Sequence, residues 1–309
     1  MSNELDFLVD DANSTDQSTV HVAGVSYPVI QWYGGERKVG MDGNVRCHGG
    51  WFVPASKLDL SGALPPGWKP SFIYVDGPKD GELIEQPGFY ATSLDIAFIN
   101  ERHQYTVGRG KDAKIFPANQ YDAANKHAEE MTKIVGKPMF PRKKSQFFVV
   151  VKGIESPVVL TLSGAFAKAM SGQTGLLQRF NRDVMGYVNA QLKSAGTNNL
   201  LPRRRFWITV GLSLNAEGKP EFEKFGEGKD AVYKVKPAIY GIPSALSMDY
   251  IKSIHTGAAN KDRFDQLYTE SLDWSKAWDA IKAGATEEKA EAQAAVVTDP
   301  ETAAALKDL

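Results

Sequence analysis

The chain has 309 residues, of which 42% are hydrophobic and 24% charged, as is typical of a folded globular protein. Its longest apolar runs, FFVVV and PVVL, are far shorter than the roughly 20 residues of a membrane-spanning helix, and its acidic N-terminus lacks the positive region of a secretory signal. The single cysteine, Cys47, excludes an intrachain disulfide and favours a reducing, cytoplasmic compartment.

The overall charge of −1 is unevenly distributed. Residues 1–20 contain five acidic residues and no Lys or Arg, and residues 283–309 contain six acidic against two basic residues. Residues 21–282 therefore carry a net charge of +8. We expect a basic body that attracts polyanions, flanked by a disordered acidic N-terminal tail and an Ala/Glu-rich acidic C-terminal tail. Acidic tails can fold back over a basic groove or recruit protein partners. The alternative is that the tails are simply solvated.

The first part of the body, residues 20–56, contains short segments rich in β-branched and aromatic residues. The pairs Gly34–Gly35 and Gly49–Gly50 between them predict tight turns. The candidate ligand residues here are Trp32, Arg37 and Lys38. Exposed aromatic rings beside cations suit base stacking and phosphate contact. Trp32 is equally well explained as a core residue.

Pro and Gly are frequent in residues 60–92, which predicts loops around one short strand at 71–75. Alternation of apolar and polar residues predicts a half-buried strand at 94–98, then a turn and a second strand at 104–107. The composition of residues 117–136 predicts a helix.

Two basic triplets, Arg142-Lys143-Lys144 and Arg203-Arg204-Arg205, each open a strongly apolar strand. Apolar residues on both faces of QFFVVVKG predict a strand that is covered on each side. Residues 176–195 predict an amphipathic helix, because apolar residues recur at spacings of three and four. These residues are Leu177, Phe180, Val184, Val188 and Leu192.

If residues 203–214 form one strand, alternation places Phe206, Ile208 and Val210 on the core side together with Arg204. The opposite face then presents Arg203, Arg205 and Trp207, which suits phosphate binding and base stacking. Residues 233–241 repeat this pattern. Their outward residues are Lys234, Lys236 and Tyr240.

The end of the body, from about residue 244, is predicted to be helical. We therefore expect one composite β-rich body of the α+β class over residues 21–282. Its centre would be an OB-like antiparallel barrel or sheet, elaborated by long loops and C-terminal helices.

Catalytic and metal-binding motifs are not recognisable. The five histidines are scattered, and Cys47 and His48 would point to opposite sides of a strand. No P-loop and no GxSxG motif occurs. We therefore expect no cofactor, no metal and no enzymatic activity, with one alternative left open. A nuclease could use carboxylates such as Glu82, Asp95 and Glu101.

The motifs GVSYPVIQWYGG, GGWFVPAS, SPVVLTLSG and LPRRRFWITVGLS together resemble a family of uncharacterised proteins carried by bacterial plasmids and other mobile elements, described as a domain of unknown function. The resemblance covers roughly residues 25–255 and implies no specific activity or catalytic residue. The plan of a basic β-rich body with an acidic C-terminal tail is also similar to phage-type single-stranded DNA-binding proteins with an OB-fold. The tail departs from theirs by ending in Lys307-Asp308-Leu309, without a terminal aromatic residue.

The sequence thus predicts a sequence-independent single-stranded nucleic-acid-binding protein, with DNA as the expected ligand, serving replication, recombination or defence on a mobile element. We expect a homo-oligomer without membrane association. A self-assembling structural or scaffold protein is the alternative.

Overall fold

The computed structural model describes residues 27–37, 45–57, 64–76, 83–108, 113–225, 232–279 and 282–286. The expected N-terminal tail and nearly all of the expected C-terminal tail lie outside the described residues. No helix within the described part is long and apolar enough to cross a membrane.

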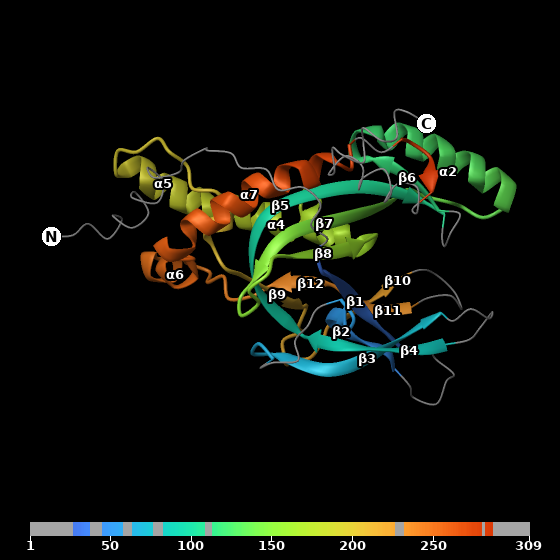
Figure 1. Cartoon of the computed structure of the whole chain (residues 1–309), viewed down its shortest axis with the longest axis horizontal. Coiled ribbons are helices and arrows are strands. Elements are labelled where there is room, and N and C mark those ends of the chain that lie inside the picture. The colour runs from blue at the N-terminus through green and yellow to red at the C-terminus, as the bar shows by residue number, and fades with distance from the viewer. Residues whose placement is uncertain are drawn as a thin grey trace.

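One 11-stranded sheet organises the fold, with the main strand order β12-β9-β5-β7-β8-β1-β2-β4-β3 (Figure 1). β6 pairs with β5, and β13 pairs with β6. Its strands are β1 (Val29–Arg37), β2 (Val45–Pro54), β3 (Trp68–Asp76), β4 (Leu83–Ala91), β5 (Ser93–Val107), β6 (Lys114–Pro117), β7 (Arg142–Val151), β8 (Val158–Ser163), β9 (Ile208–Leu212), β12 (Pro237–Ile239) and β13 (Ala285–Thr286). A separate ribbon pairs β10 (Phe222–Phe225) with β11 (Val232–Val235).

The sheet is mostly antiparallel, with β1 and β8 forming a parallel pair. β12 and β3 end the main path, so the sheet is not closed into a barrel. The expected mixed α+β class with a large antiparallel sheet is confirmed, whereas the barrel form of that expectation is wrong. The folded part also continues past the expected boundary at residue 282, because Ala285 of β13 pairs with Ile115 of β6.

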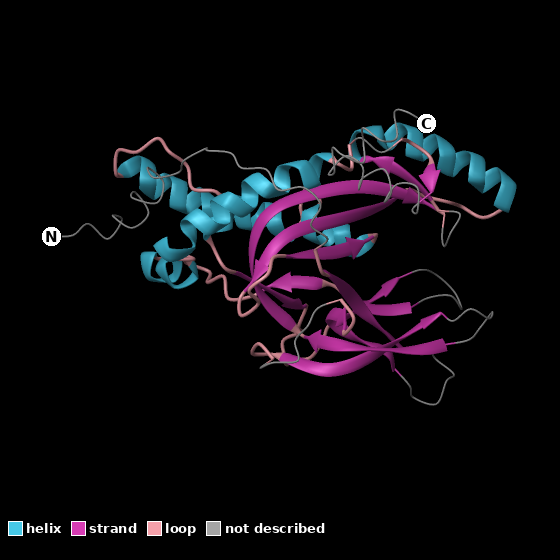
Figure 2. Ribbon diagram, in the orientation of Figure 1, coloured by secondary structure: helices cyan, strands magenta, loops and turns pink. Residues whose placement is uncertain are grey.

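Residues 96–99 of β5, 147–151 of β7 and most of β8 are apolar on both faces, because core clusters lie on both sides of the sheet here. Helices cover this part of the sheet (Figure 2). Phe147 and Val149 pack in one core cluster with the helical segment 176–194, while Phe148 and Val150 pack in another with α7. The segment consists of α4 (Leu176–Phe180), a π-helical turn (Asn181–Met185) and α5 (Gly186–Ser194). All five residues of its predicted apolar stripe are buried, so that prediction is confirmed.

The other helices are α2 (Tyr121–Val135), α3 (Ala165–Ser171), α6 (Met248–Ile254) and α7 (Lys261–Lys276). α2 confirms the predicted helix and ends at Gly136, whose φ of 70° suits glycine. α6 begins where the Ser247 side chain accepts a hydrogen bond from the Tyr250 N–H, so the expected C-terminal helices are present.

The glycine pairs are not turns. Gly34 lies inside β1 and faces Gly49 of β2. A Cβ atom on Gly34 would come within 2.5 Å of the Phe166 ring and 2.8 Å of the Lys234 Cβ. Glycine is therefore required here so that α3 and the β10–β11 ribbon can pack closely on β1.

Residues 60–92 also differ from their prediction, because β3 and β4 are nine-residue strands rather than loops around one short strand. β3 ends the sheet, and edge strands tolerate proline, as at Pro70. β5 is likewise one continuous strand, in which a bulge between Phe98 and Asn100 replaces the expected turn.

Candidate nucleic-acid interface

The arginine triplet does not extend the strand that follows it. Arg203, Arg204 and Arg205 form a 3₁₀ turn after Pro202, and β9 begins only at Ile208. Alternation between two faces does not apply in such a turn. The prediction that Arg203 and Arg205 project from a strand toward a ligand is therefore wrong in its geometry.

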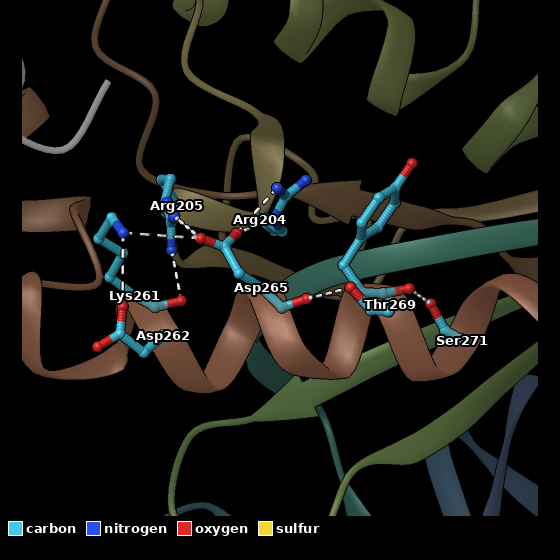
Figure 3. A network of polar contacts seen from close by, with 8 residues as sticks. Arg204, Arg205, Lys261, Asp262, Asp265, Thr269 and Ser271 are labelled. Carbon is cyan, nitrogen blue, oxygen red and sulfur yellow. Dashed lines mark hydrogen bonds and ion pairs between the residues drawn. The ribbon is translucent and has the colours of Figure 1, made fainter. Parts of the chain in front are cut away.

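Arg205 is fully buried, and its guanidinium is held by α7 (Figure 3). Its Nη2 lies 2.5 Å from Oδ2 of Asp265, and its Nη1 donates to the Lys261 carbonyl at 2.8 Å. Arg204 binds the other carboxylate oxygen of Asp265 at 2.8 Å, and its guanidinium lies 4.4 Å from the Tyr268 ring centroid. One carboxylate thus binds two neighbouring guanidiniums, and this arrangement anchors α7 to the turn.

Arg203 belongs to a second interior group, centred on Glu101. Its Nη2 lies 3.3 Å from Glu101 Oε2, and Nε2 of His103 lies 3.7 Å from the other carboxylate oxygen. Burial raises the pKa of Glu101, but the hydrogen bond from His103 and the charge of Arg203 outweigh this effect, so the pKa falls below its usual 4.5. Glu101 therefore stays ionised among cationic neighbours.

Lys143 reaches the same region from β7, where its Nζ donates to the Ser171 carbonyl at 3.0 Å. Burial lowers the pKa of Lys143, and the nearby charge of Glu101 opposes that shift. Ser145 lies 3.0 Å from both His103 Nδ1 and Ser171 Oγ. Because Ser145 is fully buried, this hydrogen-bonded group fixes α3 on the sheet and does not present its hydroxyl to a substrate.

Replacing Glu101 with glutamine should lower stability at neutral pH, with a loss that disappears in acid. A depressed folded-state pKa stabilises the fold above 4.5, and this stabilisation is lost as the pH falls through the folded value. Urea midpoints of the two proteins should therefore converge well below pH 4.5. Glu130→Gln, on the exposed side of α2, is the control. A gap that stays constant with pH would contradict the proposed role of Glu101.

Two carboxylates of the nuclease alternative, Asp95 and Glu101, are not brought together. The bulge in β5 puts Asp95 and Glu101 on opposite faces of the sheet, where Asp95 accepts from Thr209 and Glu101 pairs with Arg203. Glu82 lies outside the described residues. Among the described residues, no group of three His, Cys, Asp or Glu side chains could hold a metal ion.

Trp207 and Tyr240 line the same pocket beside β9. The predicted alternation holds from Phe206 onward: Phe206, Ile208 and Val210 are buried, and Trp207 remains half-buried on the opposite face. Trp207 and Tyr240 line a pocket of about 250 Å³ between β9, the residues after β12, and α6.

The first predicted cluster is not exposed. Trp32 is buried, and its indole Nε1 donates to the Val235 carbonyl at 3.3 Å, so the alternative interpretation as a core residue is correct. Arg37 ends β1, but its side chain and the whole of Lys38 lie outside the described residues.

The two predicted lysines, Lys234 in β11 and Lys236 just after it, both have contacts within the protein. The Cβ of Lys234 packs over Gly34, and the side chain is half-buried. Lys236 forms an ion pair with Glu223, so the charge of Lys236 is partly neutralised within the protein. These lysines are thus less open to a ligand than their alternation suggested.

The first residue of the other triplet faces solvent. Arg142 begins β7 opposite Thr106 and donates to the Gly108 carbonyl while remaining exposed. Lys144 is half-buried. Two residues before Arg142, the ring of Phe140 is 72% exposed.

Sequence reasoning missed Phe140, although it stands in the cationic stretch KPMFPRKK. It also missed Tyr121, which is 46% exposed at the start of α2.

Comparison of the chain with protein-family models, curated proteins and solved structures found no match.

Proposed function

We propose that this protein binds single-stranded nucleic acid without sequence preference, through a surface formed by α2 and the segment returning from it to β7. We call Tyr121, Lys133, Lys137, Phe140 and Arg142 the Phe140 surface. All five side chains are exposed. The observation that carries the proposal is the 72% exposure of Phe140 between Lys137 and Arg142.

The aromatic rings of this surface are available for stacking. Burial would be expected of a phenylalanine that served only the core. The neighbouring Met139 packs against the small apolar cluster under α2, and its N–H donates to Thr132 Oγ1 at 2.9 Å. The backbone beside Phe140 is therefore anchored while the ring faces solvent. A ring held in this way can stack on any base, which gives binding without sequence readout.

The charge around the Phe140 surface favours a polyanion. Residues 113–144 contain seven Lys or Arg against three acidic residues. The positive charge of Arg203 is compensated by Glu101, and that of Arg205 by Asp265. Lys133 and Lys137, in contrast, are exposed on the surface. Phosphates can therefore be neutralised here, with release of counterions and a strong dependence on salt.

The proposed mode of binding is OB-like in one respect: bases stack on aromatic rings beside a curved sheet, and cations follow the backbone. DNA is the ligand we favour, because the chain's general plan is similar to phage-type single-stranded DNA-binding proteins. Such a protein would serve replication, recombination or defence on a mobile element.

An anisotropy titration tests this function. Labelled oligothymidylate should bind at low salt, more tightly than a duplex of the same length, because only unpaired bases can stack on Phe140. The affinity should fall steeply as salt is raised. An RNA strand is the parallel sample that tests the preference for DNA. No measurable binding of any single strand at low salt would refute the proposed function.

A second candidate function, self-assembly as a scaffold, has one observation in its favour. The edge strand β3 carries Phe72 at 46% exposure, and the adjoining strand β4 carries Ile84 at 44%. An exposed apolar edge can pair with another copy of the chain. Light scattering without nucleic acid should then show a large assembly that Phe72→Lys disrupts, whereas an unassembled protein would refute it.

A further inference from the structure

The pocket beside β9 is lined by residues that suit the binding of a planar ring. It encloses about 250 Å³, slightly below the usual range of about 300–1,000 Å³ for small-molecule sites. The aromatic residues that line it are Trp207, Tyr240, Tyr250 and Phe180. Aromatic walls around a space of this size suit one flat heterocycle better than a long or branched molecule.

Among the hydroxyl groups that line the pocket, those of Thr209, Tyr240 and Ser253 already donate hydrogen bonds within the protein. The Tyr240 hydroxyl donates to the Leu212 carbonyl, and the Thr209 hydroxyl donates to Asp95 at 2.6 Å. The Tyr250 hydroxyl has no partner among the described residues. Burial raises the pKa of Tyr250, so this hydroxyl remains protonated and can donate to a carbonyl or ring nitrogen of a ligand.

A lysine side chain lies beside Trp207, which lines the pocket. Lys152, in the turn after β7, places its Nζ 6.0 Å from the ring centroid of Trp207. Its side chain is 62% exposed and lies 3.9 Å from the Asp95 carboxylate. An exposed ammonium beside a stacking ring can contact the phosphate attached to a base that enters the pocket.

We propose that this pocket takes one base of a bound single strand, with Trp207 and Tyr250 as its principal contacts. This inference rests on the proposed nucleic-acid-binding function. The pocket lies near Asp95 at the beginning of β5, whereas the Phe140 surface lies near Thr106 at its other end. Eleven residues of the curved and bulged strand β5 separate these positions by at most about 36 Å, so one strand of nucleic acid must be long enough to reach both.

Filling the pocket provides the test. Ser253 lines the pocket from α6, and its own hydroxyl donates to the Tyr250 carbonyl within that helix at 2.7 Å. Ser253→Trp places a ring in the space, whereas Ser253→Ala at the same position leaves the space open. Both are compared by anisotropy with an oligothymidylate long enough to span the two surfaces, and with an abasic strand of equal length.

The expected result is that Ser253→Trp binds oligothymidylate at least about fivefold more weakly than Ser253→Ala, because one stacked base is lost. The two variants should bind the abasic strand equally. Equal affinity for oligothymidylate would overturn the pocket assignment while leaving the proposed function intact, whereas absence of binding by the wild-type protein would refute the function itself. If circular dichroism shows that Ser253→Trp does not fold, Tyr250→Ala takes its place. Tyr250→Ala should also bind oligothymidylate at least about fivefold more weakly than Ser253→Ala, and equal affinity would overturn the pocket assignment.

Discussion

Replacing Arg205 with alanine should lower the free energy of unfolding by about 2–5 kcal/mol, because it deletes a fully buried side chain with its hydrogen bonds, while Asp265 keeps Arg204 as its partner. Arg205 is fully buried, and Asp265 is only 13% exposed. The substitution also removes the donor to the Lys261 carbonyl, at the first turn of α7. Urea unfolding followed by circular dichroism measures the loss.

Arg182→Ala is the control for the stability measurement. Arg182 also pairs with an aspartate, Asp183, but both side chains are largely exposed on the surface. The free energy of unfolding of Arg182→Ala should equal that of the wild type within experimental error, because solvent screens exposed ion pairs. If Arg205→Ala were as stable as the wild type and instead lost affinity for single strands, Arg205 would be a ligand residue and the structural role assigned to it would be wrong.

Replacing Phe140 and Arg142 together with alanine should weaken binding to a single strand by about 10- to 100-fold at low salt. The loss combines one stacking ring with one phosphate contact, and the slope of log affinity against log salt should decrease by about one. Stability should change little, because both side chains are exposed. Anisotropy titrations at several salt concentrations measure both quantities.

Phe72→Ala is the control for that double variant, because Phe72 is also a largely exposed phenylalanine, 46% accessible, but lies on β3. Its affinity for the strand should equal that of the wild type. Equal losses in the two variants would show that exposed phenylalanines contribute nonspecifically, and the Phe140 surface would then lose its special role.

Alternation along the sequence predicts the buried side of β7 and β9, although it does not predict the strands β3 and β4 or the continuity of β5. Phe147, Val149, Phe206, Ile208 and Val210 were assigned to the core, and all are buried. The covered strands and the apolar helical stripe follow from the same argument, because periodicity records which side of an element is buried. The α+β class was therefore predictable, whereas the path and curvature of the sheet depend on long-range pairing.

The arginine triplet shows where this argument ends. Pro202 begins a tight turn, so Arg203 and Arg205 leave the strand alternation just before β9 starts. Their partners, Glu101 and Asp265, lie far away in sequence and are brought near by β5 and α7. A single sequence does not show such pairings, so a basic cluster that anchors a helix looks the same as one that binds phosphate.

Glycines gave a second misleading signal. Gly34 and Gly49 predict turns from their local context, but the structure uses Gly34 so that Phe166 can pack against a strand. Phe140 gives no signal in the sequence, because an apolar residue between Pro138 and Pro141 does not show whether its ring faces the core or the solvent. Its exposure follows from the way α2 and Met139 pack, which only the folded structure determines.

Photocrosslinking tests the central proposal most directly. A single strand containing photoreactive thymine analogues is bound at low salt, irradiated and mapped by mass spectrometry. The Phe140 surface predicts crosslinks within residues 136–144, and these should disappear in Phe140→Ala/Arg142→Ala and persist in Phe72→Ala. A strand that binds and crosslinks elsewhere while leaving residues 136–144 unlabelled would contradict the proposal.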